Sequence, residues 1–256
     1  MKVDLHVHTN KYSNCGVSSP EEMVQAAIAC GLDAIVLTEH DYMWRPEELA
    51  SLQARFPRIK LFSGIEVSVD SAEHVVVIGV PHPQLFTPFM RPADLVAAVR
   101  RHQGAAILAH PYRWSPSVRQ DILAVQLDAV EVYSNSIRNY MQQPIRDLHD
   151  KLKLPLVASS DGHHTEHLGL YAIDLHQPAR DDKDLARMIR QGQFSIWTNP
   201  ERISAINQDI AAKAKKLPEL LRTGMTTRDA LRAAGIRGYL SYAVDNNYDI
   251  LFPTGA

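Results

Sequence analysis

The chain has few cysteines, and they do not indicate a disulfide-stabilised protein. Only two occur in 256 residues, Cys15 and Cys30. Two cysteines cannot form the disulfide framework typical of small secreted domains, and they fit a reducing compartment better.

Long apolar runs are also missing. The longest β-branched run, residues 75–78, is far too short to cross a bilayer. The first residues enter a strand-like pattern at once, without the apolar stretch of a signal peptide. We therefore expect a cytoplasmic protein with no membrane partner.

No strong charge of one sign is present either. The formal net charge is -2 at pH 7, so the whole chain has no electrostatic attraction for nucleic acid or an anionic membrane. An activity directed at phosphate would need locally placed cations. The length favours one large domain, or one domain with a small appendage.

Up to residue 199, short β-branched runs alternate with helical patterns. Ser19, Pro20 and Glu22 form a good helix start, with a capping box. The other expected helices are 46–56, 92–103, 117–124, 140–152 and 182–191. The expected strands are 2–7, 34–38, 60–62, 75–80, 105–109, 129–132 and 156–159. Repeated strand–helix units imply an α/β fold with a parallel sheet, open or closed into a barrel.

The composition shifts after Asn199-Pro200. We expect a domain of residues 1–199 and a small, mostly helical extension over 200–256, with a β-branched run at 249–252. Within the extension, segments 226–231, 234–236 and 239–242 have helix–turn–helix spacing. Residues 201–256 hold eight basic and six acidic residues. Because this excess is weak, we favour a packing or oligomer role over DNA binding.

Histidine is abundant, with 12 residues between His6 and His176. His6 and His8 lie two apart on the first strand, so both side chains face one side and can form half of a metal site. An isolated pair of this kind could equally be two packed histidines. Further candidates follow later strands, and we expect them at one rim of the barrel: His40, Glu66, His110, Asp161 and His163.

His74 differs from the others because it begins its strand, so it must reach the site from the incoming side. Imidazoles and carboxylates gathered at one rim would be costly to bury unless paired or metal-bound. Nitrogen and oxygen ligands of this kind suit zinc, manganese or iron.

In combination, these motifs resemble the PHP (polymerase and histidinol phosphatase) family of metal-dependent phosphoesterases. The resemblance covers roughly residues 3–175. It implies a distorted (β/α)7 TIM-like barrel with two or three divalent metals. The matching motifs, in the family's order, are Asp4-Leu5-His6-Val7-His8-Thr9, Thr38-Glu39-His40-Asp41, Gly64-Ile65-Glu66, His74, Ala109-His110-Pro111 and Ser160-Asp161-Gly162-His163.

The resemblance also implies a ligand set. One metal would bind His6, His8, Glu66 and Asp161, and Glu66 would bridge to a second metal on His74 and His110. A third metal would use His40 and His163. Family members often add an aspartate or histidine from the loop after the first strand. Here Asn14 is nearest and binds metal poorly, while Cys15 is either a thiolate substitute or a plain loop residue, so two metals and three both remain open.

The expected reaction is attack on a phosphate ester by a metal-bridging hydroxide. Asp161, His163 and Asp41 are the candidate catalytic residues, the last two near the leaving oxygen. Arg113 and Arg138 follow strand ends and are candidates for binding substrate phosphate, although either could be a solvated surface arginine. The substrate would be a small phosphomonoester, a nucleotide or a short oligonucleotide.

Two alternatives remain open. Amidohydrolase-type metalloenzymes also begin with His-x-His but often bridge their metals with a carboxylated lysine, and Glu66 stands where that lysine would be expected. A non-catalytic, metal-stabilised regulatory module that binds a partner through its extension is the other.

Overall fold

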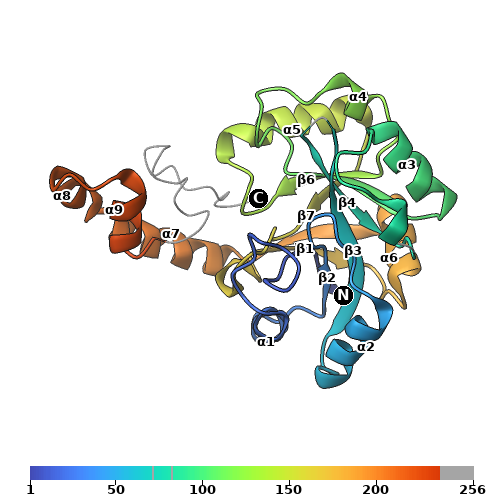
Figure 1. The fold of residues 1–256 in the computed structure, drawn as a ribbon, viewed down its shortest axis with the longest axis horizontal. Helices are drawn as coiled ribbons and strands as arrows, with labels where there is room; N and C mark the ends of the chain where they lie inside the picture. Colours follow the sequence, from blue (N-terminus) through green and yellow to red (C-terminus); the bar gives the residue numbers. More distant parts are fainter. Residues whose placement is uncertain (71, 82, 237–256) are drawn as a thin grey trace. The chain divides into compact units, whose positions relative to one another are not determined.

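The computed structural model describes residues 1–70, 72–81 and 83–236. In these ranges nine strands form one sheet in the order β7-β6-β5-β4-β3-β2-β1-β8-β9. The first seven strands therefore follow the chain order across the sheet (Figure 1). The strands are β1 (Lys2–Val7), β2 (Ala34–Leu37), β3 (Lys60–Ser68), β4 (His74–Ile78), β5 (Ala105–Ala109), β6 (Ala129–Tyr133), β7 (Leu156–Ala158), β8 (Tyr171–Leu175) and β9 (Phe194–Thr198).

Helices alternate with the first seven strands, except between β3 and β4, as the sequence predicts. The structure has α1 (Pro20–Ala29), α2 (Pro46–Arg55), α3 (Pro92–Arg101), α4 (Gln120–Leu123), α5 (Asn139–Leu152), α6 (Asp182–Arg190), α7 (Pro200–Ala214), α8 (Leu217–Arg222) and α9 (Thr227–Ala233). Two short 3-10 turns, η1 (Pro83–Leu85) and η2 (Thr165–His167), lie in connections.

The chain beyond β7 returns to β1 and nearly closes the sheet. The amide of His8 donates to the carbonyl of Gly162 (2.8 Å), and the amide of Gly162 donates to the carbonyl of His6 (3.0 Å). Val7 and Gly162 form a parallel bridge. The predicted TIM-like α/β barrel with a helical C-terminal part is therefore confirmed.

The expectation of a parallel sheet is wrong at two strands, β4 and β8. β4 is antiparallel to both β3 and β5, and β8 is antiparallel to β1 and β9. Residues 69–73 join β3 to β4, a connection long enough for a hairpin but too short for the crossover that parallel neighbours require. Because β4 runs in the opposite direction, its first residue, His74, lies at the same end of the barrel as the last residues of β3 and β5.

The predicted start of α1 is confirmed. The Ser19 hydroxyl accepts from the amide of Glu22 (3.3 Å), and the Glu22 carboxylate accepts from the amide of Ser19 (2.7 Å), which completes the capping box. The inner face of α1, with Met23, Val24 and Ala27, packs on the outside of the sheet.

The barrel interior is filled by alternate residues of its strands, among them Val36, Phe62 and Ile107. Leu185 and Ile189 of α6 belong to the same buried cluster. The helix packs against β3, β4 and β5.

Close packing of α6 depends on Gly79, which follows β4. Gly79 has a φ of +80°, and a Cβ atom there would lie 2.6 Å from the Cβ of Ala186. Only glycine fits both the backbone angle and the short distance. Since Gly79 follows the last residue of β4, α6 covers the end of the barrel opposite to His74.

The chain divides into two compact units. One comprises Met1–Ile137 and Met141–Thr198, and the other comprises Arg138–Tyr140 together with the residues from Asn199 on. In the second unit, the side chain of Asn199 accepts from the amide of Arg202 and caps α7 (3.0 Å). A small apolar cluster joins α8 to α9. Segment 239–242 of the helix–turn–helix prediction, and the run at 249–252, lie outside the described residues.

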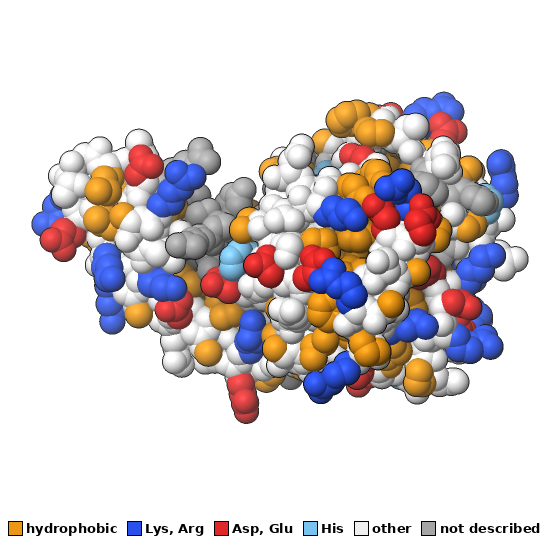
Figure 2. Space-filling view, turned by 60° about the horizontal axis from the view of Figure 1, so that its bottom comes forward, with side chains coloured by type: hydrophobic (Ala, Val, Ile, Leu, Met, Phe, Trp, Pro, Cys, Tyr) orange, Lys and Arg blue, Asp and Glu red, His pale blue; other side chains and the backbone are white. Residues whose placement is uncertain are grey.

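The surface carries charges of both signs. Figure 2 shows acidic and basic side chains interspersed on the face it presents, in keeping with the small net charge. Among the described residues, no helix is long and apolar enough to cross a membrane.

Candidate metal centre

A β-bulge directs the histidines of β1. The register between β1 and β2 shifts between Asp4 and Val7. Before the shift, Val3 and Leu5 pack in the barrel interior, whereas Val7 packs with α1 on the outside. His6 and His8 alternate with Val7, so they face the barrel axis. The extra residue in β1 thus aims both imidazoles at the mouth of the barrel.

The eight predicted metal ligands come together at this mouth. They come from six strands of the first unit. One is the first residue of β4, and the others lie near the ends of their strands or in the residues that follow. They are His6, His8, His40, Glu66, His74, His110, Asp161 and His163.

The carboxylate of Glu66 lies among five imidazoles and is fully buried. Its Oε1 is 2.8 Å from Nδ1 of His74 and 2.9 Å from Nε2 of His110. Its Oε2 is 2.9, 3.1 and 3.3 Å from ring nitrogens of His40, His8 and His6. Each oxygen therefore faces a different set of potential ligands, as a bridging carboxylate does.

Asp161 supplies the second carboxylate. Its Oδ1 lies 3.5 Å from Nε2 of His6, 3.4 Å from Nε2 of His8 and 3.5 Å from Nδ1 of His163. Its Oδ2 accepts a short hydrogen bond from the hydroxyl of Ser136.

Several of these buried atoms lack a hydrogen-bond partner of acceptable geometry among the described residues. They are Nε2 of His6, Nε2 of His8, Oε2 of Glu66 and Oδ1 of Asp161. Buried polar atoms are rarely left unsatisfied, and here they face one another. Imidazole nitrogens and carboxylate oxygens in this arrangement fit divalent metal ions.

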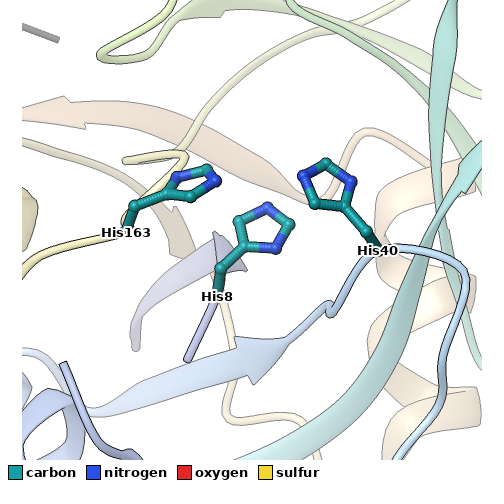
Figure 3. Close-up of side chains that lie close together, drawn as sticks. All are labelled: His8, His40 and His163. Carbon is teal, nitrogen blue, oxygen red and sulfur yellow. The ribbon is translucent and has the colours of Figure 1, made fainter. Parts of the chain in front are cut away.

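Four groups of side chains place their ligand atoms within 4.8 Å of one another. They are His6–His8–Glu66, His6–His110–Asp161, His40–Glu66–His74 and His8–His40–His163. Figure 3 shows the last group, with the ring of His8 between those of His40 and His163. The ring centroids are 4.5 Å apart for His8 and His40, and 4.2 Å apart for His8 and His163.

The charges of the cluster are unevenly distributed. Burial opposes ionisation of Glu66, but the imidazoles of His6, His40 and His74 hold the pKa of Glu66 well below its usual range. Burial, and the neighbouring His8, lower the pKa of His163 to about 2. Burial also lowers the pKa of His110. The carboxylate is therefore ionised and these two imidazoles are neutral, which are the protonation states that bind metals.

The carboxylate of Glu131, on β6, contacts two of the predicted ligands and holds them in place. Its Oε1 lies 3.3 Å from Nδ1 of His6 and accepts a short hydrogen bond from Ser159. Its Oε2 accepts from the amide of His110 (2.8 Å). A carboxylate on the far nitrogen fixes the orientation and tautomer of a ligating histidine. This role of Glu131 was not predicted from the sequence, although an acid within an otherwise apolar strand was the available signal.

Ser13 and Glu39 support His8 in the same way. The Ser13 hydroxyl lies 3.2 Å from Nδ1 of His8 and donates to Glu39 (2.6 Å). Glu39 also accepts from the indole of Trp44 (3.0 Å) and from the amide of Thr9 (3.0 Å). The motif Thr38–Asp41 contained Glu39, but nothing in its spacing distinguished a support from a ligand.

The remaining predicted residues have different surroundings. Nη1 of Arg113 lies 3.5 Å from Oδ2 of Asp161 and 3.4 Å from Nε2 of His110, so its guanidinium points into the cluster. Asp41 accepts from the amide (2.8 Å) and the hydroxyl (2.9 Å) of Ser68 with its two carboxylate oxygens. Arg138 is buried and groups with the second unit.

Comparison with known families agrees with this centre. Residues 4–110 match the PHP domain family, and residues 143–194 match the family described as PHP-associated. The resemblance drawn from the motifs is therefore confirmed, and the chain belongs to the PHP family. With its cluster of imidazoles and carboxylates, it falls in that family's class of metal-dependent hydrolases.

Individual relatives are more distant. A 5′-3′ exoribonuclease of Haemophilus influenzae is 32% identical over 89 residues, which span 33% of this chain and 31% of the relative. A two-domain protein of Bacteroides vulgatus, described as containing a predicted PHP-like metal-dependent phosphoesterase, aligns with a TM-score of 0.61 and 17% identity, over 78% of this chain and 65% of that one. A lesion-specific endonuclease of Pyrococcus furiosus aligns with a TM-score of 0.55 and 14% identity, over 76% of this chain and 57% of that one.

Proposed function

We propose that this protein is a metal-dependent phosphoesterase that hydrolyses the phosphate ester of a nucleotide, a short oligonucleotide or a small phosphomonoester. The observation that carries the proposal is the position of Glu66, whose two oxygens face separate sets of imidazoles. Two cations joined by one carboxylate are the usual centre for displacement at phosphorus.

The proposed ligands follow from the distances. His6, His8, Glu66 and Asp161 would hold one ion, and Glu66 would share a second with His74 and His110. His40 and His163 remain for a third. Zinc, manganese and iron all suit these nitrogen and oxygen ligands.

When bound, such ions lower the pKa of water and neutralise the oxygens of a phosphate ester. The chain's own groups would complete the site. Arg113 lies beside Asp161 and His110, where its guanidinium can bind a phosphate oxygen of the substrate. Arg138 is a second candidate for binding phosphate. The ionised carboxylates of Glu66 and Asp161 balance the positive charge of bound ions.

His163 is better suited to bind or accept than to donate a proton at the leaving oxygen. Its Nδ1 lies 3.0 Å from the carbonyl of Asp161, which fixes the ring proton on Nδ1 and makes Nε2 the unprotonated nitrogen. Asp41 would act on the centre indirectly, because it holds Ser68, two residues beyond Glu66.

A substrate with a nucleoside part is favoured within the proposed class. The relative from Haemophilus influenzae is an exoribonuclease, and the fold is similar to that of the endonuclease from Pyrococcus furiosus. The guanidinium of Arg113 lies 4.5 Å from the ring of Trp114, which is largely exposed. An exposed aromatic ring beside a cation suits the base and the phosphate of one nucleotide.

We propose that the C-terminal extension, residues 200–256, is a separate unit that begins near residue 200. The division of contacts after Thr198 supports that boundary. Packing or assembly remains its proposed role.

The test begins with protein that has been freed of metal with a chelator and then reconstituted with zinc or manganese. Phosphate release would be measured with mononucleotides, short oligonucleotides carrying a terminal phosphate, and phosphodiesters. We expect metal-dependent release that is lost in His6→Gln and in Asp161→Asn, and kept in His176→Gln, where the histidine is exposed and lies beyond β8. Full activity and metal content in the first two variants would contradict the proposal.

The same assay separates the alternatives. Hydrolysis of cyclic amides without phosphate release would favour an amidohydrolase. Bound metal without turnover of either substrate class would favour a regulatory module.

A further inference from the structure

The predicted metal ligands differ in their exposure to solvent. The side chain of His40 is 27% exposed and that of His74 is 15% exposed. The side chains of the other six predicted ligands are at most 4% exposed. A substrate can reach the centre only through its accessible side, so we expect it to enter over these two imidazoles.

A short chain of hydrogen bonds forms the edge of this entrance. Asp41 follows His40, and its two carboxylate oxygens accept from the amide and the hydroxyl of Ser68. Ser68 ends β3 and is the antiparallel partner of His74. The carbonyl of Ser68 accepts from the amide of Phe89 (2.6 Å). The backbone of Phe89, in the connection from β4 to α3, is therefore fixed beside the entrance.

The backbone of Phe89 has a conformation that bulky residues rarely adopt, with a φ of +61°. The amide of Met90 donates to the carbonyl of Thr87 (3.3 Å), which closes a turn with Pro88 second and Phe89 third. A positive φ at the third position of a turn normally selects glycine or asparagine. A parallel bridge between Met90 and Val69 holds the turn against the end of β3.

Packing does not account for a phenylalanine at this position. Phe89 is 70% exposed, the most of any large hydrophobic residue in the part of the chain that the structure describes. Phe86, in the same connection, is buried and supplies the apolar contact that anchors the loop. Strained backbone that presents an aromatic ring to solvent is typical of ligand-binding positions, because it adds nothing to the stability of the fold.

We propose that Phe89 binds substrate by stacking its ring on the base of a nucleotide whose phosphate lies at the metal centre. Ser68 is two residues beyond Glu66, about 7 Å along β3, and Phe89 is about 5 Å to the side, one strand spacing away. The nucleoside attached to that phosphate spans this distance. The inference rests on the proposed function and narrows its substrates to nucleotides and short oligonucleotides.

A second exposed ring lies across the entrance. Trp114 follows β5, whereas Phe89 is attached to β3, and β4 with its first residue His74 lies between these two strands. The entrance therefore has an aromatic ring on each side, an arrangement suited to single-stranded nucleic acid. Stacking on a neutral ring favours a base over no base without selecting one particular base.

Binding of two ligands that differ only in the base tests the proposal. The full-length protein, reconstituted with metal, would be titrated by calorimetry with the phosphonate analogue of adenosine monophosphate, whose carbon–phosphorus bond is not hydrolysed, and with the matching ribose phosphonate. Stacking predicts that the wild type binds the adenosine compound about 5- to 150-fold more tightly. Phe89→Asn suits the positive φ and removes the ring, so it should lose most of this preference and bind the ribose compound as the wild type does.

Two further variants and a stability measurement complete the test. Phe89→Tyr keeps an aromatic ring and should keep the preference. Ile196→Ala, at an exposed apolar residue of β9, should behave as the wild type. The melting temperature of Phe89→Asn should not fall, because the ring is exposed and asparagine tolerates the turn.

Three results would overturn the proposal. They are a wild type without preference for the adenosine compound, a Phe89→Asn variant that keeps the preference, and one that loses affinity for both ligands equally together with stability or a change in oligomeric state. The last result would assign Phe89 to packing or to contact with a second copy of the chain. The proposed function fails separately, if the metal-loaded wild type releases no phosphate from any ester.

Discussion

Oε1 of Glu66 and Nδ1 of His74 lie 2.8 Å apart, although one residue is near the end of β3 and the other begins β4. The antiparallel pairing of Ser68 with His74 produces this proximity. A ligand at the start of a strand can join ligands at strand ends only where one strand is reversed. The reversal of β4 adds His74 to His110 beside Oε1 of Glu66, and this supports its proposed bridging role.

Replacement of Glu131 tests the support behind the ligands. In Glu131→Gln the carboxylate beside Nδ1 of His6 is lost, so the ring is no longer held in one tautomer. We expect metal affinity or kcat/KM to fall by about 10- to 100-fold, the usual cost of losing such a partner. Metal titration and steady-state kinetics would measure the change. Glu47→Gln, at an exposed glutamate of α2, should leave both unchanged. An unaltered affinity in Glu131→Gln would contradict the role.

Arg113 tests substrate binding. A hydrogen bond to a charged group contributes about 1.5–3 kcal/mol, so Arg113→Ala should raise KM for phosphate esters at least about tenfold. Metal content should stay at the wild-type level. Arg113→Lys keeps the positive charge but lacks the planar guanidinium, so its KM should lie between those of the wild type and Arg113→Ala. Arg119→Ala, at an exposed arginine paired with Asp121, is the matched control. Loss of metal in place of weaker binding would show that Arg113 only supports Asp161.

Asp184 provides a pH test remote from the centre. Hydrogen bonds from Arg187, then from Arg180, lower the pKa of Asp184 to about 2, below its ordinary value of 3.8. The carboxylate therefore stabilises the fold above about pH 4, and this stabilisation is lost as the pH falls toward 2. Because the arginines are largely solvated, Asp184→Asn should cost on the order of 1 kcal/mol at neutral pH.

Urea unfolding would measure the difference in the free energy of unfolding between the wild type and Asp184→Asn, at neutral pH and at about pH 3. This difference should be smaller at the lower pH. A difference that does not change with pH would mean that Asp184 acts through packing or helix capping and not through its charge.

The sequence predicted the barrel, and which residues gather at its mouth, better than it predicted strand direction. Alternating strand and helix patterns located seven strands, but β8 and β9 were missed. β8 is buried along almost its whole length and β9 is partly exposed, so neither gives a clear alternation of apolar and polar residues. We expected His74, at the start of its strand, to reach the site from the incoming side, but we did not predict that β4 is reversed.

Other features depended on tertiary structure. The bulge in β1 arises from pairing with β2, and nothing local to Asp4–Val7 signals it. The contact between Glu131 and His6 joins residues 125 positions apart, so no motif spacing could identify it.

Metal content of Glu66→Gln, compared with the wild type, tests the bridging carboxylate most directly. Each protein would be freed of metal, reconstituted with zinc or manganese, and analysed for bound ions, with circular dichroism to confirm that the variant is folded. If Glu66 joins two ions, the folded variant should lose at least one equivalent per chain together with phosphate release. A folded Glu66→Gln protein that keeps the wild-type metal content and activity would contradict the two-metal centre.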